Sequence, residues 1–168
     1  MFGKIIILKK LNMEIIKKQK LDPDEKEMVF NLWNSEYPVS LSFQAMSDMD
    51  NYLDTLPGLT FYLLKNDKNK TEGWAMTFGR EDEIWFAITI AKNVQGQGKG
   101  TFLLARLKTD NDVINGWVID HENDYKPNGE IYRSPLQFYK KNDFEVFPGI
   151  RLEIPVLSAL KISWKKNK

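Results

Sequence analysis

The feature that most constrains this chain is a glycine-rich turn between an apolar segment and a helical one. Residues 95–101 contain three glycines, and residues 83–90 before them are apolar nearly throughout. Such a segment is typical of a central strand buried on both faces, and residues 101–107 have helical periodicity. Glycines here let successive backbone N–H groups point into one concavity at the positive end of the helix dipole. The turn therefore predicts a pyrophosphate site, because a mere tight turn would hardly need three glycines.

Two other phosphate-binding patterns do not fit this turn. A Walker loop ends in Gly-Lys followed by Ser or Thr, whereas Lys99 is followed by Gly100. A dinucleotide fingerprint needs a glycine where Thr101 stands and opens the first βαβ unit, whereas this turn lies past mid-chain. The ligand is therefore expected to belong to another class.

The turn carries the spacing Gln95-x-x-Gly98-x-Gly100, which resembles the pyrophosphate loop of the GNAT superfamily of acyl-CoA N-acyltransferases. A second segment, Phe138-Tyr-Lys-Lys-Asn-Asp-Phe144, is similar to the family's aromatic-Tyr-x-x-x-Gly-Phe helix end. Here Asp143 replaces the usual glycine, so we expect a different helix C-cap. The agreement covers residues 83–147, and residues 1–57 agree in outline.

The resemblance and the hydropathy pattern together predict one α/β domain over residues 1–168, with 1–12 as a possible N-terminal extension. Strands are expected at 13–21, 59–64, 73–78, 83–90, 113–119 and 144–147, with one or two more in the last 20 residues. Helices are expected at 23–35, 42–56, 101–107 and 135–142, the first N-capped by Asp22 with Pro23 following. The resemblance implies a mixed central sheet of about six to seven strands, flanked by about four helices. Its central parallel strands, 84–90 and 113–119, would splay apart at one end.

The resemblance also implies the ligand and the activity. A pantetheine arm would lie in the gap between the splayed strands and bond to the backbone of Ile88, Thr89 and Ile90. The pyrophosphate would be held by Gln95, Gly96, Gln97, Gly98, Lys99, Gly100 and Thr101. The implied reaction is acetyl transfer from acetyl-CoA, as co-substrate, to an amine that attacks directly. The alternative is a non-catalytic module that binds or senses acyl-CoA.

Two residues resemble the family's catalytic groups. Tyr139 matches the tyrosine that protonates the departing thiolate, although a packed aromatic is the alternative. Glu83 resembles the catalytic glutamate of the histone acetyltransferases, but its spacing to Gln95 is one residue too long. One residue reverses the face of a strand, so we predict a β-bulge between 84 and 90 that turns Glu83 to the gap. A regular strand would leave the base to a water chain or to Glu36 or Asp120.

Further candidates lie in loops. His121 beside Asp120 is a possible acid–base pair, although a lone histidine in a loop is more often incidental. The segment 33–38 mixes aromatic residues with Glu36 and lies where the family builds its acceptor wall. Glu36 could hold a cationic amine there, although a helix-ending loop with core aromatics is the plainer account.

Composition excludes several classes. The chain has no cysteine and one histidine, so a disulfide framework, a thiolate nucleophile or a multi-histidine metal site is not expected. A formal net charge of +1 argues against a nucleic-acid partner. Ile5 to Leu8 is too short an apolar run for a membrane helix. We expect a cytoplasmic monomer or homodimer.

Overall fold

The computed structural model describes residues 12–167, which form a seven-stranded sheet in the order β1-β2-β3-β4-β5-β7-β6. The predicted extension at residues 1–12 lies, apart from Asn12, outside the described residues. The strands are β1 (Met13–Lys18), β2 (Thr60–Asn66), β3 (Thr71–Arg80), β4 (Glu83–Ile90), β5 (Val113–Val118), β6 (Glu145–Ile154) and β7 (Leu157–Lys165). The helices are α2 (Pro23–Glu36), α3 (Met46–Asp54), α4 (Lys99–Asp110) and α5 (Leu136–Lys141), with short 3₁₀ turns η1 (Val39–Leu41) and η2 (Lys92–Val94).

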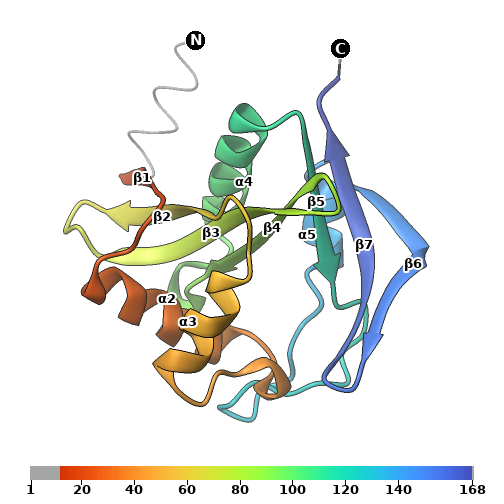
Figure 1. Ribbon diagram of the computed structural model, residues 1–168, viewed down its shortest axis with the longest axis horizontal. Helices are drawn as coiled ribbons and strands as arrows, with labels where there is room; N and C mark the ends of the chain where they lie inside the picture. Colours follow the sequence, from red (N-terminus) through yellow and green to blue (C-terminus); the bar gives the residue numbers. More distant parts are fainter. Residues whose placement is uncertain (1–11, 168) are drawn as a thin grey trace.

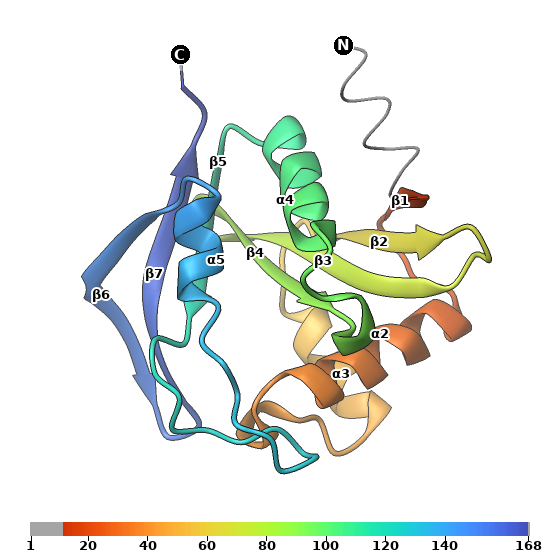
Figure 2. The ribbon, with the colours of Figure 1, turned by 180° about the vertical axis from the view of Figure 1, so that it is seen from behind.

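Helices cover both faces of the sheet. Figure 1 shows α2 and α3 on one side, and Figure 2, from behind, shows α4 and α5 on the other. Alternate residues of each strand serve the two faces, as the pleat requires. Leu63 and Trp74 pack under α2 and α3, whereas Tyr62 and Ala75 pack under α4. The predicted mixed α/β sheet is confirmed.

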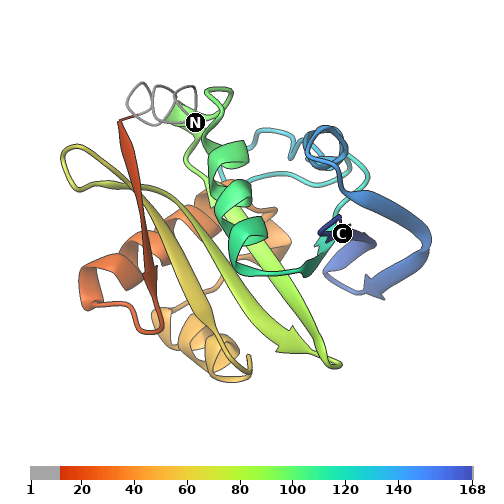
Figure 3. The ribbon, with the colours of Figure 1, turned by 90° about the horizontal axis from the view of Figure 1, so that it is seen from above.

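The central strands β4 and β5 separate as predicted. They are parallel, and they pair only at Trp85 and Asn115. Asn115 is buried, and its side-chain amide donates to the Ile84 carbonyl at 3.1 Å, which ties the strands together at this point. Beyond it, β4 continues to Ile90 and pairs with no strand of the described chain on this edge. Figure 3 shows β1–β4 on one side of the molecule and β5–β7 on the other.

The start of α2 agrees with its local sequence. Asp22 accepts a hydrogen bond from Glu25 N at 2.8 Å, and the Glu25 carboxylate accepts one from Asp22 N at 3.2 Å. This reciprocal capping box satisfies two of the N–H groups that a helix start leaves free. The predicted N-cap at Asp22 is confirmed.

The second predicted helix begins later than expected. Residues 42–45 are not helical, and α3 starts at Met46. Side chains of α2 hold the chain extended before that point, because Asn34 bonds both the N–H and the carbonyl of Phe43, at 2.9 and 3.0 Å. Trp33 also donates from its indole nitrogen to the Leu41 carbonyl at 2.8 Å. The backbone that a longer helix would have used is thus already bonded.

The C-terminal end of α5 corrects another expectation. Asp143 has φ of +66°, the left-handed conformation that glycine adopts readily, and Phe144 N bonds back to the Tyr139 carbonyl at 3.1 Å. Aspartate tolerates this conformation better than most residues. The cap is therefore like that of a glycine, and the expected difference at this helix end is wrong. No helix within residues 12–167 is both long and apolar enough to cross a membrane.

Candidate active site

The glycine-rich turn presents the bare N-terminus of α4. Gly96 and Gly98 have φ of +75° and +78°, which L side chains rarely adopt. Gly98 is the N-cap of α4, and among residues 12–167 no side chain bonds the first N–H groups of this helix. The unbonded N–H groups and the helix dipole together favour an anion at this turn. This geometry supports the predicted pyrophosphate loop.

Two side chains of the turn are bonded to the rest of the protein. Gln95 donates from its amide nitrogen to the Ile90 carbonyl at 2.8 Å and to Glu36 Oε1 at 3.1 Å. Lys99 pairs instead with Glu72 on β3 at 3.0 Å, and both side chains are largely buried. The ammonium group of Lys99 is therefore turned away from the turn, although its backbone N–H remains at the helix start.

The edge of β4 that faces the gap is defined by its pairing with β3. Ala91 N donates to Glu72 O at 2.9 Å, and the register between the two strands is regular. Because hydrogen-bonded residues alternate along an antiparallel pair, the backbone of Thr89 also faces β3. The backbone groups of Ile88 and Ile90 point the other way, into the gap. Of the three residues predicted to bond a pantetheine arm, Ile88 and Ile90 are suitably placed and the Thr89 backbone is not.

Two side chains donate hydrogen bonds to the backbone carbonyls that this edge turns toward the gap. The Tyr37 hydroxyl donates to Ile88 O at 3.3 Å, and Gln95 donates to Ile90 O. A small side chain at position 100 is needed beside them, because a Cβ there would lie 3.0 Å from the Phe138 ring. The end of β4, the start of α4 and α5 are thus in close contact.

Tyr139 lies in the core next to the gap. It is 7% exposed and packs edge-on against Phe86 and Phe144. Burial raises the pKa of Tyr139 well above its ordinary value, and the nearby hydroxyls of Tyr37 and Tyr132 raise it further. Tyr37, just after α2, and Tyr132, in the loop before α5, therefore lie close enough to Tyr139 to affect its titration. The sequence singled out Tyr139 as an acid, whereas nothing in the pattern of the loop indicated Tyr132.

The structure does not support the predicted placement of Glu83. Every residue of β4 from Glu83 to Ile90 pairs with β3 in one unbroken register, so the predicted bulge is wrong. Glu83 lies at the opposite end of β4 from the glycine-rich turn, where its exposed carboxylate pairs with Lys161 at 3.3 Å. Seven residue steps separate it from Ile90, or about 23 Å along an extended strand.

The other acid–base candidates are also engaged. Arg151 donates two hydrogen bonds of 3.0 Å to the Asp120 carboxylate and lowers its pKa, which weakens Asp120 as a base. His121 accepts from Asn123 N at 3.2 Å, within its own loop.

Glu36 is linked to the free edge of β4 by hydrogen bonds. It accepts from Gln95, which itself bonds Ile90, and from Lys126 Nζ at 3.2 Å. The side chains of Glu36 and Lys126 are each 11% exposed. Lys126 belongs to a small hairpin in the loop after β5, closed by a bridge between Tyr125 and Ile131. Glu36 could bind a cation here, but Lys126 of the same chain already pairs with it.

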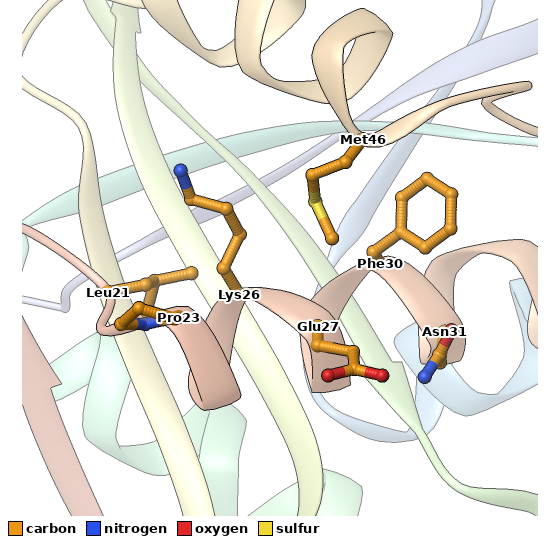
Figure 4. Close-up of a pocket in the computed structure, with 7 residues that line it drawn as sticks. All are labelled: Leu21, Pro23, Lys26, Glu27, Phe30, Asn31 and Met46. Atoms are coloured by element: carbon orange, nitrogen blue, oxygen red, sulfur yellow. The ribbon is translucent and has the colours of Figure 1, made fainter.

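A shallow groove lies elsewhere, between the start of α2 and α3. It has a volume of about 480 Å³ (Figure 4) and is lined by Leu21, Pro23, Lys26, Glu27, Phe30, Asn31 and Met46. None of these residues belongs to the gap or the glycine-rich turn, so the groove is separate from the candidate site.

No family model and no curated protein matches this sequence. Solved structures do match. One is spermidine N-acetyltransferase from Vibrio cholerae in complex with CoA and spermine, at 13% identity and a TM-score of 0.66 over 92% of this chain and 95% of that one. Another is a GNAT superfamily phosphinothricin acetyltransferase from Sinorhizobium meliloti in complex with AcCoA. It shares 11% identity at a TM-score of 0.65, over 92% of this chain and 88% of that one.

The chain has the GNAT fold. At these identities the likeness establishes the architecture, and the residues of the site must carry any argument about activity.

Proposed function

We propose that this protein is an acyl-CoA-dependent N-acyltransferase that moves an acetyl group from acetyl-CoA to an amine. The observation that carries this proposal is the continuity of two binding surfaces. The free edge of β4 at Ile88 and Ile90 leads through η2 and the glycine-rich turn to the N-terminus of α4, which no side chain within residues 12–167 caps. Coenzyme A has the matching order of parts, because its extended amide-containing arm is joined directly to its pyrophosphate.

The protein offers backbone hydrogen-bonding groups to both the arm and the pyrophosphate of the cofactor. The arm would add to the β4 edge as an extra strand does, because Ile88 and Ile90 supply both donors and acceptors there. The pyrophosphate would bond the backbone N–H groups from Gly96 to Thr101. The Gln95 side chain, which bonds the Ile90 carbonyl, would have to yield that carbonyl or share it.

The reaction needs no covalent intermediate on the protein. The amine lone pair attacks the thioester carbon, a C–N bond forms, and the carbonyl π electrons move onto oxygen. When the carbonyl re-forms, the C–S bond breaks and the thiolate takes one proton, while the nitrogen loses one. The net result is an amide and a free thiol. Holding both reactants in the gap supplies much of the rate gain.

Tyr139 is the proposed donor of the proton to the thiolate. Its high pKa keeps it protonated at neutral pH, and the same dry surroundings would also raise the pKa of the thiolate that receives the proton. Glu83 and Asp120 are bonded to basic side chains. We therefore propose that the proton of an ammonium acceptor, with a pKa of about 10.4 for a lysine-like amine, leaves through water.

A thiol-release assay with acetyl-CoA and a panel of amines tests this function. We expect release that depends on the amine, with the acetylated amine detected by mass spectrometry. Release without any amine would show thioester hydrolysis alone. Binding of acetyl-CoA by calorimetry with no release for any amine would favour the alternative, a binding or sensing module. Absence of binding would contradict both.

A further inference from the structure

The order of Ile90 and Ile88 along β4 determines which part of the cofactor the backbone of each residue would contact. Ile90 adjoins the glycine-rich turn, and Ile88 is the next residue whose backbone faces the gap. An arm that starts at a pyrophosphate on the turn reaches Ile90 first and Ile88 second. The acyl end would therefore lie at or beyond Ile88. This step rests on the proposed function.

Tyr37 places its hydroxyl at this acyl end. It follows the last residue of α2, and its hydroxyl donates to Ile88 O at 3.3 Å. The ring is supported by Trp33, whose centroid lies 4.8 Å away in an edge-on contact. Trp33 is itself stacked on Trp74 of β3, at 5.8 Å with the planes 6° apart. The hydroxyl is thus held over the β4 edge by packed aromatic rings rather than by a flexible chain.

Binding of the arm would release this hydroxyl. The Ile88 carbonyl is the natural acceptor for an amide N–H of an added strand, and a hydrogen bond of 3.3 Å is long for an O–H donor. The next residue, Thr89, has a buried hydroxyl that forms no hydrogen bond within residues 12–167. That hydroxyl lies close enough to Tyr37 to affect its titration. The released Tyr37 would therefore have a neighbour that can donate to its phenolic oxygen.

We propose that Tyr37 is a catalytic residue that donates a hydrogen bond to the thioester carbonyl oxygen during acyl transfer. As the amine attacks, the π electrons collect on that oxygen, and a donor fixed there stabilises the charge without reorganising. The proton stays on Tyr37 throughout, whereas Tyr139 gives its proton to sulfur. The two tyrosines thus have different tasks in one gap.

The ionisation of Tyr37 agrees with a donor role. Burial raises the pKa of Tyr37 to about 12, so the phenol remains protonated over the range in which an acyltransferase works. A phenolate could not donate a hydrogen bond. Loss of a single donor to a developing oxyanion typically lowers kcat by about 10²–10³-fold.

The test compares Tyr37→Phe with Tyr52→Phe. Tyr52 is the matched control, because its ring packs on the same Trp33 at 5.9 Å while its hydroxyl lies beside Arg80. We expect kcat to fall about 10²–10³-fold in Tyr37→Phe and to change less than about threefold in Tyr52→Phe. An unchanged kcat in folded Tyr37→Phe would overturn the proposal.

A binding measurement gives a readout that does not depend on turnover. S-ethyl-coenzyme A lacks the thioester carbonyl but keeps the rest of the cofactor. By calorimetry, wild type should prefer acetyl-CoA by about fivefold, the worth of one net hydrogen bond, and Tyr37→Phe should bind both alike. Equal weakening of both ligands would show a merely structural role and overturn the proposal. If wild type turned over no amine, the proposed function would fail, while this affinity ratio would still decide the contact of Tyr37 with the carbonyl.

Discussion

Lys126 and Glu36 lie ninety positions apart in the sequence, yet their charged groups are 3.2 Å apart in the fold. Both side chains are 11% exposed, so the pair is largely removed from water. It joins the hairpin that follows β5 to the end of α2. Through Gln95, the same carboxylate is connected to the free edge of β4 at Ile90.

Removal of Lys126 should therefore be costly. Lys126→Met leaves a mostly buried carboxylate without its cationic partner, and we expect a loss of about 3–5 kcal/mol in the free energy of unfolding by urea titration. Lys92→Met is the control, because it breaks the exposed pair with Glu130 on the same hairpin and should cost about 0–1 kcal/mol. The double variant Glu36→Gln/Lys126→Met should recover much of the loss. Equal losses of stability in Lys126→Met and Lys92→Met would contradict the interpretation of Glu36 and Lys126 as a buried ion pair.

The glycine-rich turn can be tested against a second glycine of like conformation. Gly98 and Gly58 both have positive φ, and a Cβ at either would meet no atom within 4 Å. Gly98→Ala and Gly58→Ala should therefore each lose about 1–2 kcal/mol of stability from backbone strain. Calorimetry should show weakened acetyl-CoA binding for Gly98→Ala alone. Unchanged affinity in that variant would remove the turn from the cofactor site.

Tyr139→Phe separates proton donation from packing. The ring keeps its contacts with Phe86 and Phe144, so acetyl-CoA affinity and thermal stability should stay close to wild type. Steady-state kinetics should show kcat reduced by about 10²–10⁴-fold, as for loss of a general acid. Full activity in this variant would leave Tyr139 as a core aromatic.

Glu83→Gln should leave the pH–rate profile unchanged. Its carboxylate pairs with Lys161 at the far end of β4, too distant to take a proton from an amine at Ile88. The profile of kcat/KM against pH is the measurement. Disappearance of an acidic limb would restore Glu83 as the base.

Stability should fall steeply in alkali. The pKa of Tyr37 is raised by burial to about 12, against about 10 in an unfolded chain. Its stabilising contribution is complete below pH 10 and is lost between pH 10 and 12, because only the unfolded state releases the proton there. The loss is up to about 1.4 kcal/mol per pH unit. Urea titrations at several pH values should show a shallower decline in Tyr37→Phe, and equal slopes would refute this.

Local sequence predicted the elements whose signals are local. The reciprocal cap of Asp22 and Glu25 involves residues three apart, so the start of α2 could be located from four letters. The bounds of β4 followed from a run of residues that is apolar nearly throughout. Side chains from α2 decided the late start of α3, because Asn34 bonds Phe43 nine residues on, and no periodicity signals such a contact.

The sequence by itself determined the order of elements, the mixed α/β class and the glycine-rich turn, because helix caps, strand alternation and glycine conformation act over a few residues. The tertiary structure decided the register of β4, and with it that Ile88 and Ile90 rather than Thr89 face the gap. It alone brought Tyr37 to the Ile88 carbonyl, fifty-one positions away, and Lys126 to Glu36. Such pairs form only when packed elements meet, so their energy depends on burial and distance that no stretch of sequence specifies.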